Sequence, residues 1–163
     1  MENKRTFIKS ELIDSDLIAK RNLTERYSQR LKDGHIFYAY LKNYKLIAYY
    51  WLSETKAPLA FGEYFLFDKK FIYIWGCYVS KEYRRQGLYK LMLKEAKDIA
   101  YERGKSKVLI YSNIENNISI EAITKCNFKL LLEFKLIKIF KIKVLLIHNK
   151  FKKIFIKDYT LKL

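Results

Sequence analysis

The hydrophobic pattern begins with helical spacing. Within residues 10–33 apolar residues recur three and four positions apart, Ser10 and Ser15 are plausible N-caps, and Gly34 is a natural stop. A polar interruption near residues 22–24 predicts two short helices in place of one.

The pattern then changes to apolar, tyrosine-rich segments that are typical of strands. A first hairpin is expected from residues 35–41 and 46–52, and a second pair from 64–67 and 71–79 around a polar turn. Residues 53–62 hold Pro58, the one proline, and are expected to form a loop.

The clearest helix covers residues 86–103, followed by Gly104. The residues expected on its apolar face are Leu88, Leu91, Met92, Ala96 and Ile99. A short buried strand is expected at 108–111, a helix at 118–126, and two or three strands after Phe128. This order predicts one mixed α/β (α+β) domain over residues 1–163, in which the basic segment 137–163 adds the last strands.

Charge narrows the function classes only partly. The formal net charge is +16, from 33 basic and 17 acidic residues. This favours an anionic partner (a phosphorylated ligand, nucleic acid or an acidic membrane surface), although a lysine-rich solvated surface explains it equally well. Base-reading modules usually cluster arginine, whereas here lysine dominates, so no nucleic-acid partner is expected.

Cysteine and histidine content limits the chemistry further. Two cysteines, Cys77 and Cys126, and two histidines, His35 and His148, give neither a disulfide framework nor a zinc site, so no metal is expected. No signal peptide or membrane span is evident, and we expect a cytoplasmic protein, with peripheral membrane contact through the basic C-terminal third left open.

The segment from Val79 to Tyr89 (V-S-K-E-Y-R-R-Q-G-L-Y) predicts a strand, a polar turn and the start of a helix. The free N–H groups and the dipole of a helix N-terminus attract anions. Gly87 permits close approach of a phosphate, and Arg84 and Arg85 add positive charge. The segment therefore predicts a diphosphate site, against the simpler reading of a basic turn before an amphipathic helix.

A second motif lies downstream, from Asn116 to Phe128 (N-N-I-S-I-E-A-I-T-K-C-N-F). Together the two segments resemble the signatures of the GCN5-related N-acetyltransferase (GNAT) superfamily, R-x-x-G-x-(G/A) and N-x-x-(A/S)-x-x-x-Y-x-K-x-G-F. Tyr89 replaces the small residue of the first, and Asn127 replaces the glycine of the second. Asparagine is the next residue willing to adopt the left-handed conformation. The resemblance covers residues 36–136 well.

The resemblance implies a mostly antiparallel central sheet flanked by helices, with two splayed strands that hold acetyl-CoA or another acyl-CoA. Backbone groups of Cys77, Tyr78 and Val79 would contact pantetheine. Asn116 and Ser119 would lie on the side where CoA leaves the protein. Backbone N–H groups from Arg85 to Lys90 would hold the pyrophosphate, and Arg84 would also bind the cofactor, so that the expected segment is Arg84, Arg85, Gln86, Gly87, Leu88, Tyr89 and Lys90.

The groups that move protons are less clear. Many family members place a tyrosine acid where this chain has Ile123, which leaves Tyr89 and Tyr111 as alternatives. Some place a glutamate base where this chain has Tyr73. Tyr73 and Glu63 are our candidate catalytic residues, with Glu54 as a further acidic alternative and a half-buried strand tyrosine as the simpler reading of Tyr73.

The resemblance implies an N-acyltransferase, most simply an N-acetyltransferase, that acts by direct attack of an amine on the thioester. A primary amine of a small molecule is the expected acceptor, such as an amino sugar, because aromatic residues are dense on the predicted strands. The alternatives are a protein or peptide acetyltransferase, a non-catalytic acyl-CoA-binding module, and a nucleic-acid or membrane-surface binder. We expect a monomer or a homodimer.

Overall fold

The computed structural model describes residues 8–10, 25–58, 64–139, 142–147 and 152–158. Its elements, in chain order, are β1 (Ile8–Ser10), α2 (Glu25–Lys32), β2 (Ile36–Lys42), β3 (Lys45–Ser53), β4 (Lys56–Pro58), β5 (Tyr64–Leu66), β6 (Phe71–Val79), the single 3-10 turn η1 (Lys81–Tyr83), α3 (Leu88–Glu102), β7 (Lys107–Asn113), α4 (Asn117–Lys125), β8 (Lys129–Ile139), β9 (Ile142–Ile147) and β10 (Lys152–Asp158).

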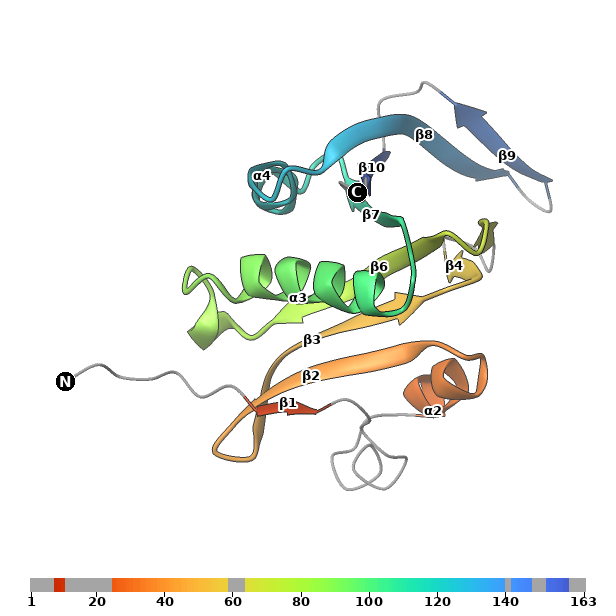
Figure 1. Cartoon of the computed structure of the whole chain (residues 1–163). Helices are drawn as coiled ribbons and strands as arrows, with labels where there is room; N and C mark the ends of the chain where they lie inside the picture. Colours follow the sequence, from red (N-terminus) through yellow and green to blue (C-terminus); the bar gives the residue numbers. More distant parts are fainter. Residues whose placement is uncertain (1–7, 11–24, 59–63, 140–141, 148–151, 159–163) are drawn as a thin grey trace, which may run out of the picture.

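The centre of the molecule is an eight-stranded sheet with the order β1-β2-β3-β6-β7-β10-β8-β9 (Figure 1). Neighbouring strands in it run antiparallel except for β6 and β7, which are parallel. Strands β4 and β5 form a separate two-stranded sheet. The predicted fold class, a mixed and mostly antiparallel sheet flanked by helices, is confirmed.

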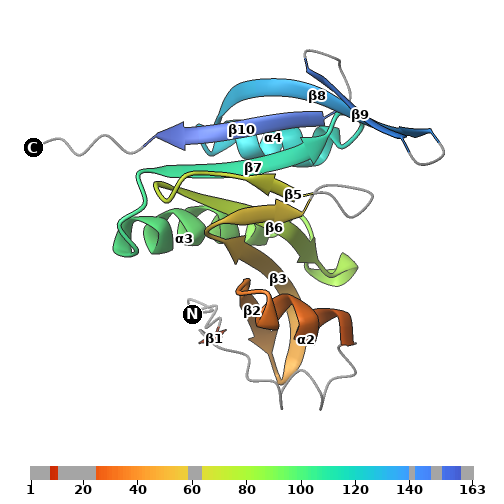
Figure 2. The same ribbon diagram turned by 90° about the vertical axis from the view of Figure 1, so that its right-hand side faces the viewer.

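Helices cover both faces of the sheet (Figure 2). On one face α3 and α4 enclose a core that includes Met92, Leu93 and Ile123. On the other face Tyr27 and Leu31 of α2 pack on a cluster rich in aromatic rings. Burial of these apolar side chains stabilises the fold by roughly 25 cal/mol per Å² removed from water.

Turn chemistry follows the sequence closely. The hairpin of β2 and β3 closes through Asn43 and Tyr44, whose φ angles of 48° and 60° suit the tight turn between paired Lys42 and Lys45. Asn127 has a φ of 61° directly after α4, so it takes the left-handed conformation for which the family motif uses glycine.

Several expectations were wrong in detail. Ser10 lies in β1; residues 11–24, which include Ser15, fall outside the described ranges, and α2 accounts for the end of the predicted helical segment. Strand β5 pairs with β4, a strand inside the expected loop, and not with β6. Leu91 is 38% exposed, because the buried stripe of α3 runs through Leu93.

Among the described helices, none has the length and apolar character needed to cross a bilayer.

Candidate active site

The two parallel strands separate halfway along their length. β6 and β7 pair from Phe71 opposite Lys107 to Ile74 opposite Ile110, and the pairing stops there. Both strands nevertheless continue, β6 to Val79 and β7 to Asn113. Beyond Ile74 the strands therefore diverge, which confirms the predicted splay.

A β-bulge lies on β6 at the point of divergence. Trp51 of β3 faces Trp75 and Tyr49 faces Tyr78, so that the single residue between them on β3 opposes two on β6, Gly76 and Cys77. Gly76 has a φ of 58°, and a Cβ atom there would lie 3.0 Å from Cδ1 of Trp51. Only glycine fits without displacement, and the bulge releases backbone groups of β6 from the regular ladder.

The turn after β6 is built to present backbone N–H groups. Arg84 donates from Nε to the carbonyl of Val79 at 3.1 Å and so ties the turn to the strand end. Arg85 and Gly87 both adopt positive φ, 59° and 80°. Gly87 is the N-cap of α3 and offers no side-chain acceptor, so the first N–H groups of the helix stay available to an anion.

A pocket of about 800 Å³ opens between these elements. Of the predicted cofactor-binding residues, it is lined by Cys77, Tyr78, Val79, Arg84, Arg85, Gly87, Leu88, Tyr89, Lys90, Asn116 and Ser119. Gln86 is the exception, since its side chain turns back to donate to the carbonyl of Glu82 at 3.0 Å. Among the described residues, the lining holds three basic side chains and no acidic one, which favours an anionic ligand.

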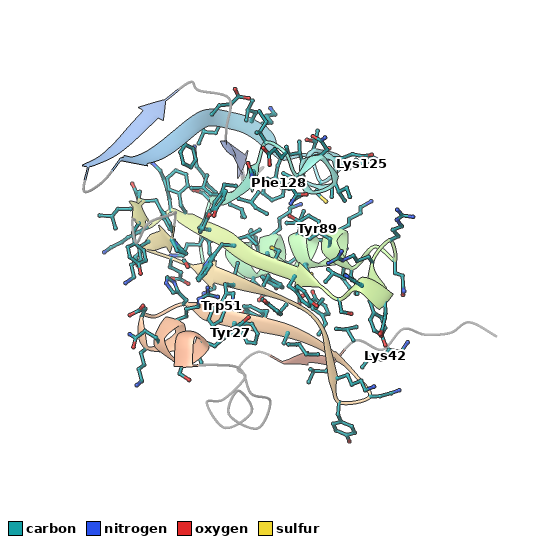
Figure 3. All side chains as sticks on the ribbon, turned by 180° about the vertical axis from the view of Figure 1, so that it is seen from behind. Tyr27, Lys42, Trp51, Tyr89, Lys125 and Phe128 are labelled. Carbon is teal, nitrogen blue, oxygen red and sulfur yellow. The ribbon has the colours of Figure 1, made fainter. Side chains whose placement is uncertain are left out.

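Helix α4 supplies the opposite wall. Asn116 caps the helix, because its side-chain oxygen accepts from the backbone N–H of Ser119 at 3.1 Å. The hydroxyl of Tyr89 lies 2.9 Å from the hydroxyl of Ser119 and so links the first turn of α3 to α4. Figure 3 shows Tyr89 between the two helices.

On the β6–β7 side the pocket is lined by aromatic residues, Trp75, Tyr78 and Tyr111. Tyr78 stacks on Tyr49 with a centroid separation of 5.2 Å, and Tyr111 stacks on Tyr73 at 6.0 Å. Trp75 and Tyr111 belong to the cluster on the face that α2 covers, and Tyr78 stacks on Tyr49 of that cluster, so the pocket reaches residues of both faces through the gap between the splayed strands.

A buried hydrogen-bond chain fixes Trp75. Its indole N–H donates to the hydroxyl of Ser53 at 2.7 Å, and that hydroxyl lies 2.6 Å from Nδ1 of His35. After accepting from Trp75, the Ser53 hydroxyl can still either donate to Nδ1 of His35 or accept from it, so the contact is satisfied in either neutral tautomer of the imidazole. The Arg30 guanidinium lies 4.6 Å from the Trp75 ring centroid, a cation–π contact.

The candidate catalytic residues do not come together in the described structure. Glu63 lies outside the described residues. Tyr73 does not line the pocket; its buried hydroxyl has no hydrogen-bond partner, and burial and the nearby Tyr111 raise its pKa well above the usual value. Because this phenol keeps its proton at neutral pH, it is poorly suited to act as a base. The role of Tyr73 as a base stays a prediction.

Glu54, the further acidic alternative, is engaged in ion pairs, and the pocket residue Cys77 is unreactive. Glu54 is paired with Arg103 and Lys105; burial works to raise its pKa, but the hydrogen bonds from these two residues outweigh burial and hold the pKa below its usual value. Burial raises the pKa of the Cys77 thiol to about 12, which leaves no thiolate for nucleophilic chemistry at neutral pH.

Sequence reasoning missed several pocket residues, namely Trp75, Gly76, Tyr83, Ile110, Ser112, Asn113, Ile118 and Ala122. Gly76 carried a usable signal, because an isolated glycine inside a strand pattern suggests a bulge. The residues of β7 carried none, since their place depends on how β7 departs from β6.

Within the described ranges, no group of three or more His, Cys, Asp or Glu side chains is placed to hold a metal ion. The sequence model of the Acetyltransferase (GNAT) family matches residues 11–128. The chain belongs to this family. It is an acyltransferase that depends on acyl-CoA. A search of curated protein sequences finds no match.

Solved structures of the same fold include GNAT relatives at low identity, which show the shared fold alone. An IAA acetyltransferase from Bacillus cereus has 16% identity and a TM-score of 0.64, over 94% of this chain and 100% of that one. A Bacillus subtilis acetyltransferase in complex with CoA has 12% and 0.65, over 95% and 100%. A GNAT acetyltransferase from Elizabethkingia anophelis with acetyl-CoA bound has 13% and 0.65, over 96% and 100%.

Proposed function

We propose that this GNAT protein transfers an acetyl group from acetyl-CoA to a primary amine of a small molecule, by direct attack of the amine on the thioester. The observation that carries the proposal is one pocket that joins the α3 N-terminus to the gap between β6 and β7. Acetyl-CoA as the donor is supported by the related Elizabethkingia anophelis structure, which has acetyl-CoA bound.

The cofactor would be held mainly by the backbone. The N–H groups from Arg85 to Lys90, together with the helix dipole, would bind the pyrophosphate. Pantetheine would lie along Cys77 to Val79, where the bulge frees backbone groups from pairing. An N–H group of this segment would also stabilise the negative charge that develops on the thioester oxygen in the transition state.

The aromatic side of the pocket supports a ring-bearing acceptor, with an amino sugar as our specific proposal. Trp75, Tyr78 and Tyr111 offer flat apolar surfaces with polar edges. The acceptor amine must be neutral to attack, and no acidic residue lines the described pocket to remove its proton. Bulk water or Glu63 would then take that proton.

Cofactor binding is tested by calorimetric titration of CoA into the wild type and into Gly87→Glu. The new carboxylate would lie where the pyrophosphate binds, and we expect CoA affinity to fall by roughly 100-fold or more. Gly34→Glu is the matched control, because Gly34 has a φ of 81° against 80° for Gly87, open space around it, and no place in the pocket lining. Equal CoA affinity of Gly87→Glu and the control would refute the site.

The acceptor class is tested by a panel of primary amines with thiol release from acetyl-CoA as the readout. Amino sugars, nucleotide-linked amino sugars, aromatic amines, amino acids and peptides with a free N-terminus or lysine are compared by kcat/KM. We expect the ring-bearing small molecules to lead by about tenfold or more. Preference for a peptide would transfer the proposal to protein acetylation.

A further inference from the structure

The position that often carries the proton-donating tyrosine in this family is occupied here by Ile123, which cannot donate a proton. Ile123 of α4 is fully buried in the core beneath α3 and has no exchangeable proton. The thiolate of CoA, which leaves when the amide forms, therefore lacks a proton donor at this position.

A hydroxyl reaches the same helix face from another element. Tyr89, at the start of α3, places its hydroxyl 2.9 Å from Ser119 of α4. Ser119 and Ile123 are four residues apart, so they lie one above the other on the same side of the helix. Both Tyr89 and Ser119 line the pocket, whereas the side chain of Ile123 is not among its lining residues.

The surroundings of Tyr89 direct its hydroxyl inward. The ring packs against the α3-side core, and Cys77 of β6 and Cys126 after α4 pack against the same core. Cys77 is part of the splayed segment of β6, where the thioester would lie. The hydroxyl thus stands between the diverging strand and α4, on the cofactor side of the gap.

We infer that Tyr89 is the proton donor to the sulfur of CoA, oriented by Ser119, and that it replaces the acid missing at Ile123. This inference rests on the proposed function. It also gives a purpose to the bulky residue that stands where the family motif has glycine or alanine.

Acyl transfer forms one carbon–nitrogen bond and breaks one carbon–sulfur bond. The amine nitrogen bonds to the carbonyl carbon, the carbon–sulfur bond breaks, and its electron pair passes to sulfur. The proton of Tyr89 Oη moves to that sulfur and gives the CoA thiol. The Ser119 hydroxyl donates to the Tyr89 oxygen and recovers a proton from solvent, while the amine releases its own surplus proton to solvent.

The protonation state of Tyr89 suits donation. Burial is the main cause that raises its pKa above the usual value, the hydrogen bond with Ser119 works in the other direction, and the balance remains upward. The phenol therefore carries its proton at neutral pH, as a donor must before the step, and is not available as a base.

The deciding experiment titrates the thiol of bound CoA by its thiolate absorbance, with the unliganded protein subtracted, and needs no acceptor. A donor from Tyr89 stabilises the thiolate, so Tyr89→Phe should lower the acid dissociation constant of the bound thiol roughly tenfold while CoA still binds. Tyr101→Phe, an exposed tyrosine on the same helix, is the control and should leave this constant unchanged.

A kinetic comparison uses acetyl-CoA with the best amine of the panel. We expect Tyr89→Phe to lower kcat by about 100-fold and Ser119→Ala by a smaller factor, with little change in the KM for acetyl-CoA. An unchanged thiol constant in Tyr89→Phe with intact CoA binding overturns this inference alone. Failure of the wild type to bind CoA overturns the proposed function as well.

Discussion

The two faces of the sheet are built from different material. The face under α3 is packed mostly with aliphatic side chains such as Leu93 and Met92, and the ligand contacts proposed on it are backbone groups at a strand end and a helix start. The face under α2 is packed with rings, including Phe37, Trp51 and Trp75. Figure 3 shows Tyr27 and Trp51 together on this side.

This difference separates the proposed cofactor contacts, which need only backbone groups, from the proposed acceptor contacts, which depend on particular side chains. Backbone donors bind a phosphate whatever the side chains are, so the cofactor site follows from the geometry of a short contiguous segment. Ring surfaces select a ligand by shape, and their arrangement depends on strands far apart in sequence. The aromatic face is therefore where specificity for the acceptor is expected to reside.

The largest expected effect comes from Trp51→Ala, compared with Leu93→Ala on the opposite face. Both side chains are fully buried. We expect losses of about 4 kcal/mol and about 3 kcal/mol in the free energy of unfolding, because the indole leaves the larger cavity. Urea unfolding measures both, and a smaller loss for Trp51 would show that the ring cluster is loosely packed.

Gly76→Ala tests the bulge where the two faces meet. The positive φ and the contact with Trp51 predict a loss of about 2 kcal/mol in stability. We also expect CoA to bind roughly tenfold more weakly, because Cys77 and Tyr78 shift. Gly34→Ala, at positive φ but in open space, should lose only about 1 kcal/mol and retain CoA affinity.

His35 makes the aromatic face sensitive to acid. Burial, Lys56 and Arg30 lower its pKa below 6.5, and Asp33 opposes them only partly. Below pH 6.5 His35 is protonated in the unfolded chain but stays neutral in the folded chain until its lower folded pKa is reached. The free energy of unfolding therefore falls as pH falls, by at most about 1.4 kcal/mol per pH unit.

The measurement is urea unfolding at about pH 7.5 and about pH 5 in the wild type and in His35→Gln. The variant should show a weaker dependence on pH between these values. An identical dependence in both proteins would assign the effect to other groups.

Tyr73→Phe should have the smallest effect. Among the described residues its buried hydroxyl has no hydrogen-bond partner, so removal should leave stability unchanged or raise it by up to about 1 kcal/mol. The turnover number with the best amine should stay within about twofold of the wild type. A loss of 100-fold or more would restore Tyr73 as the base.

The pocket lining of the proposed cofactor site was predictable because its determinants are local. Val79 to Gly87 encodes the strand end, the turn and the helix start within one segment, and Asn116 with Ser119 forms a cap over three residues. Local geometry of this kind is read from residue type and spacing.

The proton-moving groups were not predictable in the same way. The contact of Tyr89 with Ser119 spans 30 residues and depends on how α3 and α4 approach each other. The pairing of β4 with β5 likewise depends on tertiary arrangement, because the short apolar runs fit more than one partner. The burial of Tyr73 depends on rings that four other strands and a helix contribute.

Strand β10 lies between β7 and β8, although it comes after both in the chain. During synthesis on the ribosome, β7 would thus have one unpaired edge until residues 152–158 emerge. The wall of the cofactor gap that β7 forms would be completed only by this late insertion. We therefore expect acyl-CoA binding to mature after most of the chain has been made, with slow final pairing because the contacts are distant in sequence.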